Sequence, residues 1–487
     1  MTEPPIDAQH EMKRGLWWMG AATLAMRLLD VGAQLLILQF LSREAMGLAT
    51  LAWSVSVLLE AFNGLGIGQY IVRQRELGRV ELSGLFWFAT LLGVVAVAVM
   101  YFVAPLIARF YDAPELAPMI VACSVKLIFV GAALVPLQLL TRDLQFKRSG
   151  AAQTLASLGE AVTKVTLVAL GFGAWGLVLA NVARGLYLLL ALWWLAPFRP
   201  QLTLAVQSTV RAVRFGLRVA ASQILYHSYR NMDYLLIGKF LGKEAVGVYR
   251  VAFDLGMTPL EIILQLVNRV QFPIYARLRD HPRELAEAFY RSARSLLLLL
   301  GPIAALICFA SGDVLQLVGR GEWLAAVPMI QVLCWGSLLR GMSQLFPSLY
   351  NASGRPQYAV YDSALTGGTL VGGFFLALTL APPGAGALWV AWVWLLTYPI
   401  ALTAHFFMAR RCAPVTPGGM MATLLKPALG LALVSAVLGA GSFLRGTLGS
   451  PVLSLAVLLL LGLGTHLLYL HRVMHVRLGE ILPRRAA

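Results

Sequence analysis

The chain has 487 residues, of which 59% are hydrophobic and only 13% are charged, and its mean hydropathy is +0.74. This composition excludes an ordinary water-soluble protein, in which about 25% of residues are charged. The net charge of +16 does not indicate a nucleic-acid-binding protein, because the basic residues gather in short segments between apolar runs.

Apolar runs of about 20 residues, each long enough to cross a hydrocarbon core of about 30 Å, recur along the chain. They predict an all-α membrane protein with about fourteen transmembrane helices. A β-barrel would instead need short strands of alternating polarity. The expected helices span residues 16–40, 47–71, 82–108, 116–140, 150–171, 174–196, 216–240, 246–268, 292–311, 325–349, 357–380, 385–408, 421–443 and 450–471.

The basic residues between these helices fall mainly on one side of the membrane. If the N-terminus is cytoplasmic, clusters such as Lys13-Arg14, Arg410-Arg411 and Arg484-Arg485 lie inside. The opposite side holds only Arg43, Arg109, Lys239, Lys243, Arg320 and Arg445. This bias predicts that both termini are cytoplasmic and that the basic residues contact membrane lipids.

Residues 40–52 recur, 200 positions later, as residues 240–252. The Phe, Leu, Glu, Ala, Gly and Ala residues are identical in register, and a weaker match joins residues 173–180 to 384–391. Duplicated halves predict two parallel six-helix bundles related by an axis along the membrane normal, with two extra C-terminal helices. The expected parts are a cytoplasmic N-terminus at 1–15, bundles at 16–198 and 216–411, a cytoplasmic linker at 199–215, the extra helices at 412–475 and a cytoplasmic tail at 476–487.

Prolines and glycines predict irregular points in these helices. Gly64, Gly66 and Gly68 are expected to end the second helix or to permit close packing there. Kinks are expected at Pro105, Pro136, Pro259, Pro273, Pro302, Pro328 and Pro347.

Inserting an ionisable side chain at the centre of a membrane helix costs about 2.5–3.5 kcal/mol of free energy. Each such residue in the expected helices therefore requires a structural or functional explanation. Helical spacing pairs several of them: Arg27 with Asp30, Arg230 with Asp233, Arg250 with Asp254, and Glu160 with Lys164. In one interpretation these pairs neutralise each other and only stabilise the bundle.

The other interpretation is functional, because most of these charges fall on the first two helices of each repeat. Those helices would meet at the pseudo-symmetry axis, and arginines in a wet cavity there would bind phosphate oxygens. The residues concerned are Arg27, Asp30, Glu60, Arg230, Asp233, Arg250, Asp254 and Glu261.

Catalytic and nucleotide-binding motifs are absent from the sequence. GxxxxGK[ST], HExxH, CxxC and GxSxG do not occur. The four cysteines have no metal-ligand spacing. We therefore expect that the protein is not an enzyme and needs neither a cofactor nor a metal.

The segment around the second copy of the repeat resembles a known family. Residues 231–242 read Asn-Met-Asp-Tyr-Leu-Leu-Ile-Gly-Lys-Phe-Leu-Gly, residues 246–252 read Val-Gly-Val-Tyr-Arg-Val-Ala, and residues 271–273 read Gln-Phe-Pro. This resembles the N-x-D-x-x-x-I-G-x-x-L-G, V-G-x-Y-x-x-A and F-P pattern of the Wzx-type polysaccharide flippases, which belong to the multidrug/oligosaccharidyl-lipid/polysaccharide exporter superfamily. The resemblance covers essentially the whole chain.

The resemblance implies translocation of undecaprenyl-diphosphate-linked oligosaccharides across the bacterial cytoplasmic (inner) membrane by alternating access. The product would serve exopolysaccharide, capsule or lipopolysaccharide O-antigen biosynthesis, with a polysaccharide polymerase and a chain-length regulator as further partners. The family's cationic cavity maps here onto Arg27, Arg230, Arg250, Lys164 and Arg184. The candidates for a coupling-ion site are Asp30, Glu60, Asp233 and Asp254.

Other functions stay open at this point. A drug/cation antiporter of the same superfamily would need a cavity dominated by acids, and the arginines argue against it. A membrane polysaccharide polymerase or glycosyltransferase would need a long outer loop with catalytic residues, and the longest expected outer loop covers only residues 312–324. A scaffold without transport activity is a further alternative.

Overall fold

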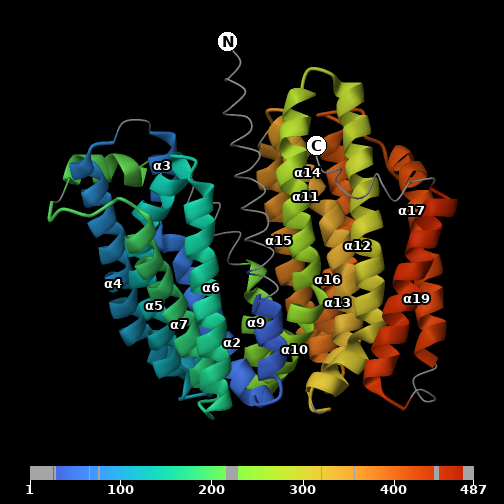
Figure 1. The fold of residues 1–487 in the computed structure, drawn as a ribbon, viewed down its shortest axis with the longest axis horizontal. Helices are drawn as coiled ribbons and strands as arrows, with labels where there is room; N and C mark the ends of the chain where they lie inside the picture. The colour runs from blue at the N-terminus through green and yellow to red at the C-terminus, as the bar shows by residue number, and fades with distance from the viewer. Residues whose placement is uncertain are drawn as a thin grey trace. The chain divides into compact units, whose positions relative to one another are not determined.

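The computed structural model describes residues 29–64, 66–74, 77–203, 205–214, 229–319, 321–355, 357–443 and 449–474, together with Met26. Within these residues all regular structure is helical (Figure 1). Arg27, most of the expected helix at 216–240 and both chain ends lie outside the described residues. The expectation of an all-α membrane protein is confirmed.

The chain divides into two compact units, residues 1–250 (unit 1) and residues 251–487 (unit 2). The predicted bundles, with a linker at 199–215, stay a prediction. Unit 1 contains α2 (Arg43–Asn63), α3 (Ile67–Arg73), α4 (Arg79–Phe110), α5 (Leu116–Arg142), α6 (Phe146–Ala169), α7 (Ala174–Leu195), α9 (Met232–Leu241) and the first part of α10 (Lys243–Gly256).

Unit 2 continues from the end of α10. It contains α11 (Thr258–Arg277), α12 (Pro282–Val318), the 3-10 turn η1 (Leu324–Ala326), α13 (Val327–Ser343), α14 (Leu345–Ala352), α15 (Gln357–Leu380), α16 (Gly386–Ala409), α17 (Pro417–Phe443) and α19 (Pro451–Arg472).

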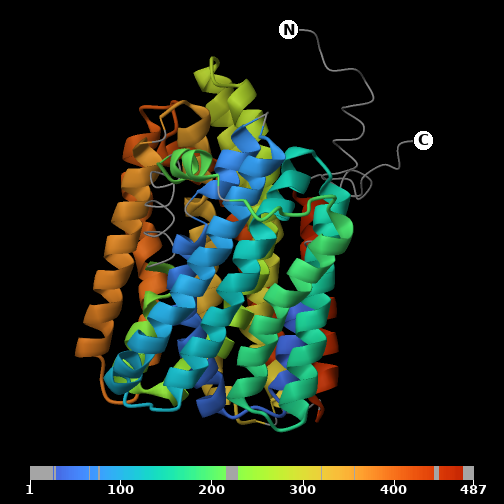
Figure 2. The ribbon, with the colours of Figure 1, turned by 90° about the vertical axis from the view of Figure 1, so that its left-hand side faces the viewer.

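Each unit has one helix around which the others pack. In unit 1, α5 contacts α2, α3, α4 and α7, and α6 packs mainly along α7 (Figures 1 and 2). In unit 2, α12 contacts α11, α13, α17 and α19, while α16 joins α13 to α15. The two C-terminal helices, α17 and α19, therefore pack against each other and against α12.

Nine helical segments among the described residues are long and apolar enough to cross a membrane. They are α4, α5, α7, α12, the run Leu324–Ala352, α15, α16, α17 and α19. The described helices α2 and α6 are not among them, and both carry acidic and basic residues. The expected number of fourteen spans stays a prediction.

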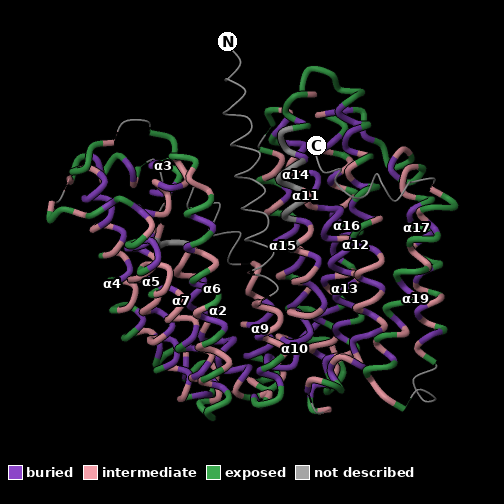
Figure 3. The backbone as a smooth tube through the Cα atoms, viewed as in Figure 1, coloured by how far each residue is buried: buried purple, intermediate pink, exposed green. Residues whose placement is uncertain are grey.

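The outward faces of these helices are apolar, unlike those of a water-soluble protein. Phe102, Trp194 and Leu460 are 75%, 82% and 71% exposed. Exposed stretches alternate with buried ones along the helices of each unit (Figure 3). Contiguous exposed apolar surface of this kind is stable in lipid and unstable in water.

The described helices break at three places where longer helices were expected. Gly66, with a φ of 70°, separates α2 from α3, since an L side chain rarely adopts this conformation. Met257 separates α10 from α11, next to the expected kink at Pro259. Gln344 separates α13 from α14 within the expected helix at 325–349, three residues before the expected kink at Pro347.

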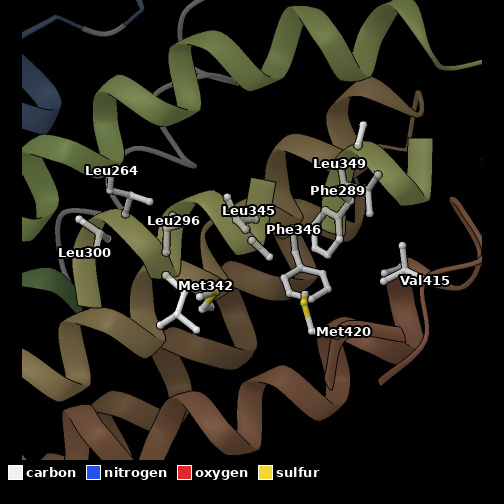
Figure 4. Packing of buried hydrophobic residues seen from close by; sticks show 14 of the residues in the cluster. Leu264, Phe289, Leu296, Leu300, Met342, Leu345, Phe346, Leu349, Val415 and Met420 are labelled. Carbon is white, nitrogen blue, oxygen red and sulfur yellow. The ribbon is translucent and has the colours of Figure 1, made fainter. Parts of the chain in front are cut away.

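The core of unit 2 gathers large aromatic and aliphatic side chains from α11, α12, α13, α14, α16 and α17. Phe289 and Phe346 meet with ring centroids 4.8 Å apart, and both are fully buried (Figure 4). Leu345 and Leu349 are fully buried in the same cluster. This core surrounds the α13–α14 break with apolar atoms.

The two copies of the sequence repeat contact each other reciprocally inside unit 1. α2 begins at Arg43 and α10 begins at Lys243, which are equivalent positions of the repeat. A methyl group added to Gly47 would overlap the carbonyl of Lys243, and one added to Gly247 would overlap the carbonyl of Arg43. Only glycine permits this approach of the two backbones on both sides of the contact.

We therefore expect Gly47→Ala and Gly247→Ala each to destabilise the protein by about 1–3 kcal/mol, the usual effect of overpacking. The measurement is the thermal unfolding midpoint of the purified protein in detergent. Gly368→Ala on α15 is the control, because a methyl group there meets nothing within 4 Å. Equal midpoints for all three variants would show that the reciprocal contact is not tight.

Candidate functional site

An ion cluster joins the starts of α2 and α10 to the turn between α4 and α5. The Lys243 ammonium lies 2.6 Å from Glu44 and hydrogen-bonds to Glu115. Lys239 donates to the carbonyl of Phe110 at 2.6 Å and lies 3.7 Å from Asp112. These contacts hold the end of α9 and the start of α10 against the N-terminal helices of unit 1.

Two groups of this cluster have shifted pKa values. The hydrogen bond from Lys243 lowers the pKa of Glu115, and hydrogen bonds to Glu115 and then Glu44 raise the pKa of Lys243. The stabilisation from Glu115 is present at neutral pH and is lost as the pH falls through its lowered pKa. The stabilisation from Lys243 is lost only as the pH rises through its raised pKa, so the cluster is intact near pH 7.

Aromatic rings surround Arg250, a predicted substrate-binding residue. Its guanidinium carbon lies 4.3 Å from the centroid of the Trp53 ring and 5.6 Å from that of Tyr234. Asp233 is fully buried and accepts a hydrogen bond from the Tyr249 hydroxyl at 3.0 Å. Arg250 is therefore fixed by cation–π contacts that link α2, α9 and α10.

Glu60, a predicted coupling-ion residue on α2, has a basic partner on α5. Its Oε1 lies 2.5 Å from the Lys126 ammonium, and the two side chains are 30% and 13% exposed. The pair is neutral overall and crosses between helices that pack together. Lys126 was not predicted as this partner.

The strongest concentration of polar side chains lies between α6 and α7. Glu160 on α6 accepts a hydrogen bond from Arg184 on α7 at 2.7 Å, and Lys164 lies 3.9 Å from the same carboxylate. Between the same two helices, the Thr163 and Tyr187 hydroxyls lie 2.9 Å apart. We call the set Ser157, Glu160, Thr163, Lys164, Asn181, Arg184 and Tyr187 the α6–α7 polar ladder.

The ladder follows from the spacing of its residues on each helix. Ser157, Glu160 and Thr163 are three residues apart on α6, and Asn181, Arg184 and Tyr187 are three residues apart on α7. Such spacing places side chains on one face of a helix. Gly159 lets the two helices approach, because a methyl group there would contact the Tyr187 ring at 2.5 Å.

The ladder holds a partly exposed cation and unused hydrogen-bonding atoms. Besides Glu160, the carboxylates of Asp30 and Glu60 act electrostatically on Arg184. Arg184 and Lys164 share one carboxylate, that of Glu160. Glu160 is 8% exposed, whereas the Arg184 side chain is 38% exposed. The Ser157 hydroxyl and the Asn181 carbonyl oxygen are buried without a hydrogen-bond partner among the described residues. These groups are suited to a ligand with anionic and hydroxyl groups.

The predicted site residues are thus distributed over several contacts. Of the predicted substrate-binding residues, the structure brings Lys164 and Arg184 together through Glu160 and places Arg250 between aromatic rings. Arg230, Asp30 and Asp254 are half-buried, and Arg27 lies outside the described residues. The sequence analysis missed Asn181 and Tyr187, although their spacing from Arg184 was a signal.

A second buried cation lies in unit 2. Arg340 on α13 is 5% exposed, pairs with Glu261 on α11 and lies 5.2 Å from the centroid of the Trp394 ring. One acid balances one base here. The pair therefore connects α11 to α13, and neither of its side chains is as exposed as that of Arg184 in the ladder.

The fold and its internal charge pairs define a multi-pass α-helical membrane protein. The chain belongs to the polysaccharide biosynthesis protein family, whose model matches residues 36–328, more than half of its length. Lipopolysaccharide biosynthesis protein WzxC of Escherichia coli (strain K12) is 24% identical over 404 residues, covering 81% of this chain and 80% of that protein. Teichuronic acid biosynthesis protein TuaB of Bacillus subtilis (strain 168) is 24% identical over 416 residues, covering 84% and 83%.

A solved structure of the lipid II flippase MurJ in an inward closed conformation shares the fold. Its TM-score is 0.72 at 12% identity, covering 94% of this chain and 99% of that one. The family predicted from the repeat segment is confirmed.

We expect a double-mutant cycle on Glu160→Gln and Arg184→Gln to give a coupling energy of about 1 kcal/mol or more, because a buried carboxylate holds the arginine. The measurement is the free energy of unfolding of the four proteins in detergent. The control cycle uses Glu287 and Arg291, 3.8 Å apart and about 70% exposed, where we expect less than about 0.5 kcal/mol. Equal coupling in both cycles would contradict a buried pair between α6 and α7.

Proposed function

We propose that the protein moves an undecaprenyl-diphosphate-linked oligosaccharide from the inner to the outer leaflet of the bacterial cytoplasmic membrane. The support is its membership of the polysaccharide biosynthesis protein family and its relatives in lipopolysaccharide and teichuronic acid biosynthesis. A fold shared with a lipid II flippase adds to this support. The product would serve exopolysaccharide, capsule or O-antigen biosynthesis.

The observation that carries this proposal is the partly exposed guanidinium of Arg184 in the α6–α7 polar ladder. Arg184 is the most exposed of the three charged side chains here, with 38% of its side chain exposed against 14% for Lys164 and 8% for Glu160. A guanidinium has five N–H donors, and the hydrogen bond to Glu160 involves the NH1 group alone. The remaining donors can bind a diphosphate in the fork geometry that arginine provides.

The buried polar atoms beside Arg184 suit the sugar portion of such a substrate. The Asn181 carbonyl oxygen accepts hydrogen bonds, and the Ser157 hydroxyl both donates and accepts them. Sugar hydroxyls would satisfy both groups. A hydrophobic cation would leave them without partners and would meet the positive charge of Arg184 and Lys164, which disfavours the antiporter alternative.

Electrostatics favour outward movement of the loaded carrier. Moving about two negative charges out of an inside-negative cell releases roughly 4–5 kcal/mol at 100 mV, from about 2.3 kcal/mol per charge. A coupling ion is therefore not needed for the loaded step. Within this proposal it would reset the empty carrier, with Asp30, Glu60, Asp233 and Asp254 as the candidate sites.

The proposal includes the topology expected from the sequence. Two six-helix bundles would rock around the substrate while its lipid tail stays in the bilayer, and both termini would be cytoplasmic. A polysaccharide polymerase and a chain-length regulator would use the product on the outer side. Arg27, Arg230 and Arg250 would add to the positive lining.

We expect cells that lack the protein to accumulate completed lipid-linked repeat units at the inner leaflet, because the units are made but not moved. The measurement is the leaflet distribution of extracted lipid-linked oligosaccharide, probed with a reagent that does not cross the membrane. Unpolymerised units at the outer leaflet would instead indicate a polymerase and would overturn the proposal.

We expect Arg184→Ala to reduce polymer production in complemented cells about tenfold or more, since a charged hydrogen bond is worth about 1.5–3 kcal/mol. Arg184→Lys keeps the charge without the fork and should retain intermediate activity. Arg291→Ala, an exposed basic residue on α12, is the control. Normal polymer production by Arg184→Ala at equal protein level would exclude the ladder as the diphosphate site.

A further inference from the structure

A buried polar cluster lies in the core of unit 2, away from the ladder. Ser343 ends α13, Asp362 lies on α15 and His405 lies on α16. The Ser343 hydroxyl is 2.6 Å from Nε2 of His405, and Oδ1 of Asp362 is 3.2 Å from Nδ1 on the other side of the ring. The exposed fractions are 5%, 8% and 0% for Ser343, Asp362 and His405.

Apolar contacts make the charge of this cluster costly to change. The Phe346 ring stacks on the His405 ring at 4.9 Å with an interplanar angle of 19°. Phe346 belongs to the buried core cluster, together with Met342 and Leu345 (Figure 4). Asp362 and His405 are neutral overall when they share one proton, whichever of them holds it. Loss or gain of a proton leaves an unbalanced charge in this core.

The hydroxyl of Ser343 allows His405 to hold either protonation state. A hydroxyl donates to Nε2 when that nitrogen is unprotonated and accepts from it when it carries a proton. On the other side, Nδ1 has no aligned hydrogen bond among the described residues, although the Asp362 carboxylate is close. The Thr366 hydroxyl donates to the same oxygen of Asp362 at 3.2 Å. A proton can therefore be held by either Asp362 or His405 while the Ser343 hydroxyl keeps a hydrogen bond to the ring.

The cluster is attached to the break between two helices. Ser343 is the last residue of α13, and α14 begins at Leu345 after the single residue Gln344. Tyr350 on α14 donates a hydrogen bond to the backbone carbonyl of His405 at 3.1 Å. Both sides of the break are thus tied to the helix that carries His405. Gln344 keeps helical backbone angles, and its N–H donates to the Arg340 carbonyl at 2.9 Å. Pro347 has no backbone N–H to donate to the Ser343 carbonyl, so the helix is weakened next to the cluster, and a proline is a common point of bending in a helix.

Few other titratable groups face the cluster. Tyr350 contacts it from α14, and Cys412, which follows α16, acts electrostatically on Tyr350. Arg340, one turn earlier on α13, pairs with Glu261 on α11. From α12 and α17 the cluster of buried residues includes Phe289 and Met420, which are apolar.

We propose that Asp362 and His405 form a proton-binding site, and that the gain or loss of its proton opens and closes the α13–α14 break. The proton comes from water and returns to it, so no other reactant is involved. A serine, a histidine and an aspartate contact each other in this order in hydrolases with a serine nucleophile. Here Ser343 is buried in the core at the end of a helix, which leaves no path for a substrate carbonyl.

This inference goes beyond the proposed function and is tested without a transport assay. The full-length protein in lipid nanodiscs is titrated with acid while infrared absorption follows the protonated carboxyl group. Hydrogen–deuterium exchange of residues 341–349, corrected for the intrinsic effect of pH, follows the helix break. We expect the carboxyl band and the exchange to change together, with one midpoint.

Three variants test whether the pH midpoint of the carboxyl band and of the exchange belongs to Asp362 and His405. Asp362→Asn should lose the carboxyl change and the pH dependence of exchange. Ser343→Ala keeps both titratable groups and should shift the midpoint by about one pH unit or more, since it removes a hydrogen bond to a charged group. His466→Gln, at a histidine on α19 outside the cluster, is the control and should titrate as the unaltered protein does.

Two results would overturn the inference. One is a pH dependence of exchange at residues 341–349 that persists unchanged in Asp362→Asn. The other is an unchanged midpoint in a correctly folded Ser343→Ala variant, as judged by its thermal unfolding in nanodiscs. A variant that lost polymer production in cells would test the proposed function and would not test this proton-binding site.

Discussion

Placing a charged side chain in the hydrocarbon core of a membrane costs free energy, and this cost constrains how the helices of this protein pack. Charged side chains between the helices meet a partner at short distance, as Glu160 does with Arg184 and Glu60 with Lys126. Arg250 instead uses the faces of Trp53 and Tyr234. Each of these contacts joins two or more helices and so helps to hold them together.

The same free-energy cost helps to distinguish ion pairs that only stabilise the fold from those suited to binding a ligand. Arg340 and Glu261 balance each other in the core of unit 2 and are suited to holding helices together. In the ladder one carboxylate serves two cations, and Arg184 remains partly exposed. The guanidinium donors that Arg184 does not use for Glu160 are suited to binding an anion. This asymmetry makes the ladder the stronger candidate for recognising a diphosphate.

Hydropathy and internal repetition predicted much of the fold. The expected helix at 357–380 has the bounds of α15, and the repeated segment places the starts of α2 and α10 at equivalent residues. Hydropathy missed the first turns of α12, which begins at Pro282 and not at residue 292, because this part is helical but charged. The interruption at Gln344 falls inside the expected helix at 325–349, three residues before Pro347, where a kink was expected.

The candidate sites were harder to predict, because they depend on helix packing. Spacing along one helix predicted the pair of Glu160 and Lys164, but at 3.9 Å this is the weaker contact of that carboxylate. The stronger one, with Arg184, spans 24 residues. His405 and Ser343 are 62 residues apart, and no local pattern connects them.

The most direct test of a diphosphate site in the ladder is photo-crosslinking of the substrate. A benzoylphenylalanine replaces Tyr187, and the control label replaces Leu190, which is 54% exposed on the same helix. In membranes that contain the lipid-linked oligosaccharide, we expect capture from position 187 that free undecaprenyl diphosphate competes away, and little capture from position 190. Equal capture from both positions, insensitive to competition, would contradict the account.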